Sequence, residues 1–276
     1  MKVNIGTYSF GGIASYLGLG PTLLEKFQTI KALGFTGVEL LPVDLDNDIE
    51  DIKKWLDETG LEVVSVHAEP TEEIVKKMAA LGGKAVIWAG TPFCNKEEAI
   101  EVAHLLDEMA EMAEPYGIKI GYHNHTDEYF VEDGKFLFDW LIEACDPEVT
   151  LFQVDCGWCS AAGVDPVEFI NKHAGKIGAI HIKENGGVIG AKQPWSRHAT
   201  ERPVFTKEDW LKIKEEHDKL NVPQGTGIVD WKAVKAAADA QHEDVIYVVE
   251  REASYNDPQD RVACLAEDIA WIKANL

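Results

Sequence analysis

Four short apolar runs in this 276-residue chain each end in a side chain that can bind a metal ion. The four residues are His123, Asp155, His181 and Glu250. Each preceding run is rich in Val and Ile and shows little polar alternation, as expected of a strand buried on both faces of a parallel sheet. If the four strands belong to one closed barrel, their carboxyl ends share a rim, and the two imidazoles and two carboxylates meet there. This donor set predicts a site for one divalent cation. We expect Mn²⁺, with Co²⁺, Zn²⁺, Fe²⁺ or Mg²⁺ as alternatives.

Further charged and polar residues stand close to these strand ends. His125 follows His123 by two positions, and Lys183 follows His181 by two, so alternation along a strand sends each pair to the same side. Arg251 directly follows Glu250. A rim of salt bridges without a metal is the alternative interpretation, because barrel rims commonly carry ionic residues.

A metal ion bound to adjacent carbonyl and hydroxyl oxygens makes the neighbouring C–H proton acidic and stabilises the resulting enediolate. We predict that Glu250 or His125 is the base, and that Lys183 stabilises negative charge or protonates an oxygen. Isomerisation, epimerisation and β-elimination all share this first step. They differ in where the proton returns or in whether a group leaves.

Other residues near the predicted rim are candidates for contacts with a substrate. We predict that His67, Glu39 and Arg251 offer polar contacts and that Trp158 offers a stacking face, although aromatic residues on barrel strands are equally often core. Cys156 and Cys159 have the C-x-x-C spacing of redox proteins but no thioredoxin-like context. We therefore interpret them as small, reduced loop residues.

The elements that would position these residues alternate strictly along the chain. The predicted strands lie near residues 3–6, 37–41, 62–67, 85–89, 118–123, 150–155, 177–183 and 245–250. The predicted helices lie near 22–33, 48–59, 71–81, 96–116, 135–145, 165–174, 230–241 and 258–274. Eight strand–helix repeats in a chain of this length predict a single (β/α)8 TIM barrel that occupies residues 1–276.

One connection is far longer than the usual few-residue loop between a strand and the next helix. It covers about residues 184–229 and contains a predicted helical piece near 206–217. Loops of this kind emerge on the catalytic face of a barrel, so we interpret the segment as an inserted lid or a subunit-contact arm.

Composition excludes several classes of protein. A formal net charge of −22 repels phosphate backbones and anionic membranes, so we expect neither a nucleic-acid partner nor a membrane partner. The first residues resemble a strand rather than a signal peptide, and no apolar stretch is long enough to cross a bilayer. We expect a cytoplasmic protein that acts on a small, neutral substrate, which the family resemblance described next identifies as a sugar or polyol.

The order and spacing of seven motifs resemble the xylose isomerase-like barrels of the sugar phosphate isomerase/epimerase superfamily, which includes ketose 3-epimerases and inosose dehydratases. The motifs are Gly37-Val38-Glu39-Leu40, Ser65-Val66-His67, Gly121-Tyr122-His123-Asn124-His125, Val154-Asp155-Cys156-Gly157-Trp158, His181-Ile182-Lys183, Gly225-Thr226-Gly227-Ile228-Val229-Asp230-Trp231 and Val248-Val249-Glu250. The resemblance implies metal ligands at His123, Asp155, His181 and Glu250, and a homo-oligomer, with a hetero-oligomer as the alternative. His123 departs from the family pattern, since the better-known epimerases have Glu there and use two glutamates as their acid/base pair.

These observations favour a metal-dependent sugar isomerase or epimerase. The main alternative is a lyase of the same superfamily, either an inosose-type dehydratase or an enzyme that eliminates the aglycone of a 3-keto-glycoside, C-glycosides included. An endonuclease on the same barrel is disfavoured by the acidity of the chain. A non-catalytic sugar-binding barrel is the fourth interpretation.

Overall fold

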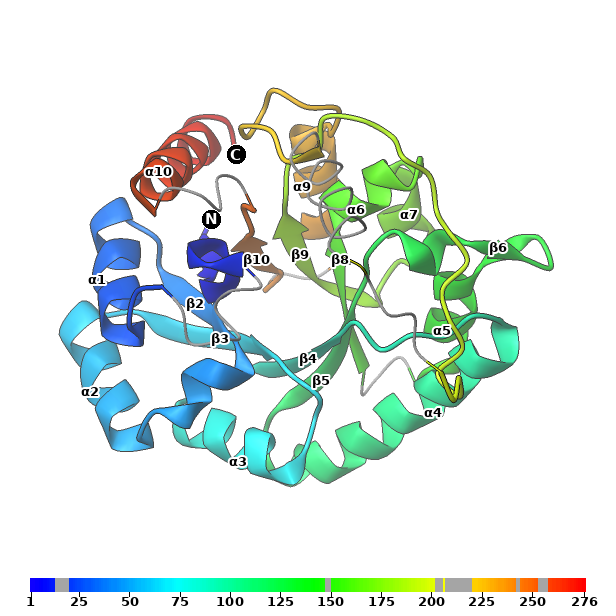
Figure 1. Cartoon of the computed structure of the whole chain (residues 1–276), viewed down its shortest axis with the longest axis horizontal. Coiled ribbons are helices and arrows are strands. Elements are labelled where there is room, and N and C mark those ends of the chain that lie inside the picture. The colour runs from blue at the N-terminus through cyan, green and yellow to red at the C-terminus, as the bar shows by residue number, and fades with distance from the viewer. Residues whose placement is uncertain (13–19, 147–149, 202–205, 207–219, 242–243, 253–257) are drawn as a thin grey trace.

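Eight parallel strands form a closed barrel in the computed structural model, which describes residues 1–12, 20–146, 150–201, 206, 220–241, 244–252 and 258–276. Strand β1 pairs with both β2 and β10, and this pairing closes the sheet. The barrel strands are β1 (Asn4–Gly6), β2 (Gly37–Leu40), β3 (Glu62–His67), β4 (Ala85–Ala89), β5 (Lys119–His123), β8 (Thr150–Asp155), β9 (Ile177–Ile182) and β10 (Ile246–Val249). Figure 1 shows these strands inside a ring of helices. The predicted (β/α)8 fold is confirmed.

The helices begin close to the predicted positions because capping residues fix their starts. Thr22 forms a capping box with Glu25 at the start of α1, and Thr71 and Asn95 accept backbone N–H bonds at the starts of α3 and α4. The helices are α1 (Leu23–Leu33), α2 (Ile49–Thr59), α3 (Glu72–Ala80), α4 (Lys96–Ala113), α5 (Leu137–Ala144), α6 (Cys156–Ala161), α7 (Pro166–Lys172), α9 (Trp231–Asp239) and α10 (Pro258–Asn275).

The sequence predicted neither a hairpin before α5 nor a short helix directly after β8. A two-stranded hairpin, β6 (Val131–Glu132) and β7 (Lys135–Phe136), precedes α5. The short helix α6 starts directly after β8, where Asp155 caps it by accepting a hydrogen bond from the backbone N–H of Trp158.

The interpretation of Cys156 and Cys159 as loop residues was therefore wrong. Both are buried in α6 as free thiols, and burial raises the pKa of each, which leaves them unsuited to thiolate chemistry.

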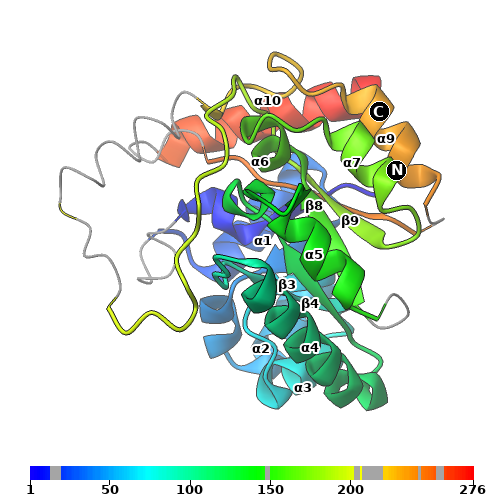
Figure 2. The ribbon, with the colours of Figure 1, turned by 90° about the vertical axis from the view of Figure 1, so that its right-hand side faces the viewer.

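The long connection after β9 is described for residues 184–201, 206 and 220–230. The predicted helical piece near 206–217 lies outside the described residues, apart from Thr206. In Figure 2 the described part after β9 runs along the outside of the barrel. The assignment of residues 1–276 to one domain, with 184–229 as a lid or subunit-contact arm, stays a prediction.

A search of the described residues for a helix with the length and apolar character of a membrane span found none. The cytoplasmic location stays a prediction.

The close packing of neighbouring strands predicts the effect of one substitution. Gly121 on β5 lies between Ile87 and Leu151, and an added Cβ would clash with the Leu151 carbonyl oxygen and lie 2.7 Å from Ile87 Cδ1. We expect Gly121→Ala to lower the free energy of unfolding by about 1–3 kcal/mol, measured by urea denaturation. As a control, Gly187→Ala adds a Cβ that meets none of the described residues within 4 Å, so its urea midpoint should match the parent. Equal midpoints for both variants would contradict this account of the packing.

Candidate metal centre

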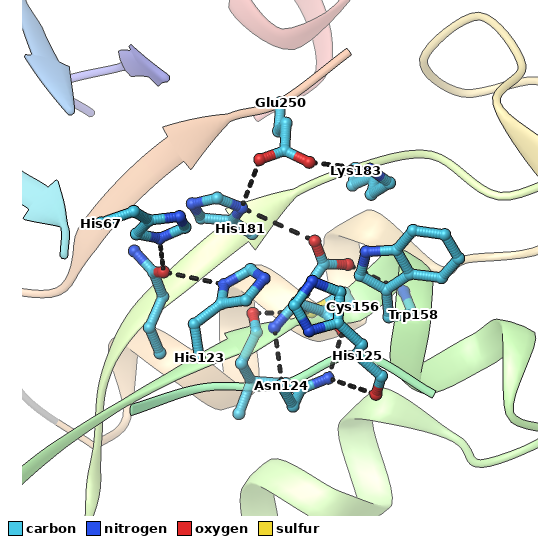
Figure 3. A network of polar contacts seen from close by, with 12 residues as sticks. His67, His123, Asn124, His125, Cys156, Trp158, His181, Lys183 and Glu250 are labelled. Atoms are coloured by element: carbon cyan, nitrogen blue, oxygen red, sulfur yellow. Dashed lines mark hydrogen bonds and ion pairs between the residues drawn. The ribbon is translucent and has the colours of Figure 1, made fainter. Parts of the chain in front are cut away.

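The carboxyl ends of β5, β8, β9 and β10 bring four candidate ligands to one end of the barrel. His123 and Asp155 are the last residues of β5 and β8, His181 is the penultimate residue of β9, and Glu250 directly follows β10. Asp155 pairs in register with His181, which in turn pairs with Val248. Figure 3 shows His181 at the centre, with Glu250 above it and His123 below it in that view.

Asp155, His181 and Glu250 form a compact group of possible metal donors. Their ligand atoms lie within 4.8 Å of one another, and all three residues are buried. His181 Nδ1 lies 3.6 Å from Asp155 Oδ2 and 3.6 Å from Glu250 Oε2. Asp155 Oδ2 and His181 Nδ1 have no hydrogen-bond partner among the described residues. Buried polar atoms normally have a partner, so these two fit a site that a cation completes.

The orientation of His181 is fixed from behind by a buried carboxylate. Glu39 Oε1 lies 2.8 Å from His181 Nε2, while Glu39 Oε2 accepts hydrogen bonds from Ser65 Oγ at 2.7 Å and Gln153 Nε2 at 2.9 Å. Burial alone would raise the pKa of Glu39, but the imidazoles of His67 and His181 outweigh it and hold the pKa at about 2. Glu39 is therefore a carboxylate that binds Nε2–H of His181 and leaves Nδ1 facing the acids, which is the usual arrangement behind a metal-binding histidine.

The potential around His181 is strongly negative. Burial of the ring opposes protonation, but the carboxylates of Glu39, Asp155 and Glu250 outweigh burial and raise the pKa of His181 to about 10. A field that attracts a proton this strongly also attracts a metal cation.

His123 and His67 lie on the other side of His181 and share one acceptor. Gln153 Oε1 lies 2.9 Å from His123 Nδ1 and 2.8 Å from His67 Nε2. Because the Gln153 amide nitrogen donates to Glu39, its carbonyl oxygen must face both imidazoles and accept an N–H hydrogen bond from each. Burial, with the neighbouring imidazoles, lowers the pKa of His123 well below its usual value, so its Nε2 carries a lone pair.

The structure divides the predicted ligands between two groups. Asp155, His181 and Glu250 form one, and His123 belongs to a second group with His67 and His181. The His123 and His181 rings are edge-to-face with centroids 4.6 Å apart, so the two groups are adjacent. The assignment of all four residues to one metal ion stays a prediction.

Lys183 lies beside this centre in an anionic setting. Its Nζ is 2.8 Å from Glu250 Oε1 and 2.8 Å from Glu252 Oε1, and it stands 4.7 Å from the centroid of the Trp158 ring. Burial disfavours the ammonium, but Glu250 and Glu252 outweigh that effect and raise the pKa of Lys183. Lys183 is therefore a cation that can donate hydrogen bonds and cannot serve as a base.

Two other predicted site residues lie differently. The His125 ring is 5.1 Å from that of His123 and 6.0 Å from that of Trp158, at the edge of the centre. Arg251 points elsewhere, since its guanidinium pairs with Asp268 on α10 at 3.1 Å. The structure therefore does not bring the Arg251 side chain to the cluster, although we predicted a substrate contact there.

Sequence reasoning missed Gln153 and Glu252. Each stands two positions from a predicted ligand, Asp155 or Glu250, on the same strand or just past it. The period-2 alternation of a strand was the available signal, because it places both side chains on the ligand side. We applied this rule to His125 and Lys183 but not to Gln153 or Glu252.

Comparisons with known proteins agree on a single family. A family model described as xylose isomerase-like TIM barrel matches residues 27–275. Over 204 residues the chain is 26% identical to an inosose dehydratase from Clostridium beijerinckii; the match covers 61% of this chain and only 65% of that relative's length. A sugar phosphate isomerase/epimerase structure from Parabacteroides distasonis is 20% identical, with a TM-score of 0.70 and coverage of 99% and 98%. A structure of the IOLI protein with a bound zinc atom is 14% identical, with a TM-score of 0.67 and coverage of 99% and 98%. At these identities the two structures establish the shared fold.

The donor group predicts the effect of removing one ligand charge. Asp155→Asn keeps a side-chain oxygen that can cap α6 but removes the carboxylate charge, so we expect Mn²⁺ affinity to fall at least about tenfold by isothermal titration calorimetry. Asp165→Asn is the matched control, because Asp165 caps α7 in the same way and is exposed. Unchanged Mn²⁺ affinity in Asp155→Asn would favour the salt-bridged rim instead.

Proposed function

We propose that this chain, which belongs to the xylose isomerase-like TIM barrel family, is an enzyme that removes the proton next to the carbonyl of a neutral keto-sugar or keto-polyol. The reaction would use one divalent cation and proceed as an isomerisation or epimerisation. The observation that carries the proposal is a buried donor group, Asp155, His181 and Glu250, in which Glu250 also touches an ammonium.

The chain has donors suited to such a cation. Asp155 Oδ2, His181 Nδ1 and Glu250 Oε2 would hold it, and His123 Nε2 is the candidate fourth donor. When bound, a divalent cation polarises a carbonyl and stabilises negative charge on its oxygen. The mixed nitrogen and oxygen set suits Mn²⁺, and the zinc described for the IOLI protein makes Zn²⁺ the leading alternative.

Glu250 and Lys183 would share the proton chemistry. The Glu250 carboxylate takes the proton from carbon, since it is the acid at the centre that lies next to a proton donor. Lys183 remains protonated between Glu250 and Glu252 and donates to a substrate oxygen, which stabilises the charge that proton removal creates.

The positions of Glu250 and Lys183 favour isomerisation over epimerisation. Inversion at one carbon requires a second base on the opposite face, where the better-known epimerases would have a glutamate. At the matching position of the family pattern this chain has His123, whose Nδ1 lies 2.9 Å from Gln153 Oε1. Transfer of the proton to the neighbouring carbon on one face needs only Glu250, so we favour isomerisation over symmetric 3-epimerisation.

Dehydration is the second candidate, and the curated relatives favour it. The chain is 26% identical to an inosose dehydratase over the matched region. An elimination needs a base at carbon and an acid at the leaving hydroxyl, and Glu250 with Lys183 offers both within 2.8 Å.

A neutral substrate fits the charges at the centre. The positive charges of Lys183 and Arg251, which follow β9 and β10, are already compensated by carboxylates, so neither residue offers an uncompensated charge to a phosphate. We also propose that the protein is a homo-oligomer, with a hetero-oligomer as the alternative.

Proton exchange in D₂O tests the role of Glu250. The parent protein is saturated with Mn²⁺ and tested with a panel of ketoses, inososes and 3-keto-glycosides. We expect NMR to show deuterium entering a substrate carbon, and this exchange should be about 10²–10⁴ times slower in Glu250→Gln. Glu252→Gln is the control, because it removes the other carboxylate on Lys183 and should slow exchange less than tenfold. The product, an isomer or a dehydrated sugar, separates the two candidates. Parent-rate exchange in metal-loaded Glu250→Gln would exclude Glu250 as the base.

A further inference from the structure

A separate cavity of about 430 Å³ lies beside the metal centre, with His125 in its wall. Small-molecule pockets commonly have volumes of about 300–1,000 Å³, so this cavity can hold a ring-sized group. None of the residues assigned to the metal lines it. His125 lies between the cavity and the metal centre, since it lines the cavity and its ring is 5.1 Å from that of His123. The cavity therefore adjoins the reaction centre without being part of it.

One wall of the cavity is the strap, which we define as residues 193–198 of the connection after β9. The strap is held against α4 by Glu98, which accepts hydrogen bonds from Ser196 Oγ and from the backbone N–H of Arg197 at 3.1 Å. His198 Nε2 also lies 2.7 Å from Glu101 Oε2. Figure 1 shows the segment after β9 reaching α4 on the side of the barrel mouth. Hydrogen bonds to α4 therefore hold the strap in place as one wall of the cavity.

The lining of the cavity combines apolar faces with polar edges. Pro92 and Phe93 lie on one side, and Pro194 and Trp195 belong to the strap. Proline and aromatic faces bind the apolar faces of sugar and aromatic rings. Such a lining suits a ring better than an extended chain.

Arg197 adds a donor that needs an acceptor. It lines the cavity, and its Nη1 is buried with no hydrogen-bond partner among the described residues. A buried donor without a partner destabilises the protein, so an oxygen on the bound group would restore the lost hydrogen bond. Asp127 and Glu128 also line the cavity and would repel a phosphate dianion. The acceptor expected here is a neutral hydroxyl.

We propose that this cavity binds a second ring of the substrate, a hydroxylated aromatic or sugar ring joined to the keto-sugar that reacts at the metal centre. The substrate class is then a glycoside rather than a free monosaccharide. Trp195 stacks on the second ring, and Arg197 donates to its hydroxyl. The identity of the first ring rests on the proposed function, but the binding of the second ring does not.

The proposal is tested by measuring how four probes bind to the full metal-loaded chain. Binding is measured by saturation-transfer NMR and by calorimetry. The probes are 4-hydroxyphenyl β-D-glucopyranoside, cellobiose, glucose and glucose 6-phosphate. We expect one of the two-ring probes to bind at least about tenfold more tightly than glucose, and the better of the two identifies the ring type. Trp195→Ala and Arg197→Met should each remove most of this preference, whereas Trp195→Phe should retain it.

Three outcomes would overturn the proposal: two-ring probes that bind no better than glucose, tightest binding of glucose 6-phosphate, or a preference that survives Trp195→Ala. Asp155→Asn separates this proposal from the proposed function. If the ring preference persists in Asp155→Asn, or in a protein that shows no deuterium exchange, the second-ring site stands and only the assigned chemistry fails.

Discussion

The buried carboxylate of Glu39 is the constraint on which the rest of the centre depends. A charge inside a barrel is costly unless hydrogen bonds and opposite charges compensate it. Glu39 is compensated by Ser65, Gln153 and the imidazoles of His67 and His181. These contacts determine which nitrogen of His181 faces the acids. They also fix the Gln153 amide, whose oxygen then sets the tautomers of His67 and His123. One carboxylate thus orients three histidines.

The charges at the mouth are organised around this arrangement. Asp155 and Glu250 add negative charge beside His181, where a divalent cation would be the compensating group. Lys183 compensates the negative charge of Glu250 and Glu252 by forming an ion pair with each, and its ammonium lies over the face of Trp158. Cation site and ammonium therefore flank the same carboxylate. Such an arrangement would suit the proposed removal of a proton next to a carbonyl, because the charge that develops on oxygen would be stabilised from both sides.

His123 and the cavity beside His125 are the two features of this chain that bear most on its substrate and its chemistry. The family match identifies the barrel, whereas function depends on the side chains placed on it. His123, a neutral imidazole, ends β5 where the resemblance to the epimerases predicts a carboxylate, so the candidate metal site has a different charge and a different set of available bases. The strap held by Glu98 forms a second compartment with its own polar and apolar character. The proposed chemistry and the proposed selection of substrate would therefore lie in two adjacent regions of the barrel mouth.

The sequence by itself determined the barrel and most of its rim. Apolar, β-branched runs that end in His, Asp or Glu predict buried parallel strands whose carboxyl ends meet, and Asp155, His181 and Glu250 do meet. It could not determine what each side chain contacts, because those partners come from other strands of a closed sheet. Glu39 and His181 are 142 residues apart in the chain, yet their side chains are 2.8 Å apart. Arg251 follows Glu250 directly, yet its side chain turns to Asp268 on α10, since adjacent residues at a strand end project to opposite faces. Local pattern fixed the strands, and only barrel closure decided which charges became neighbours.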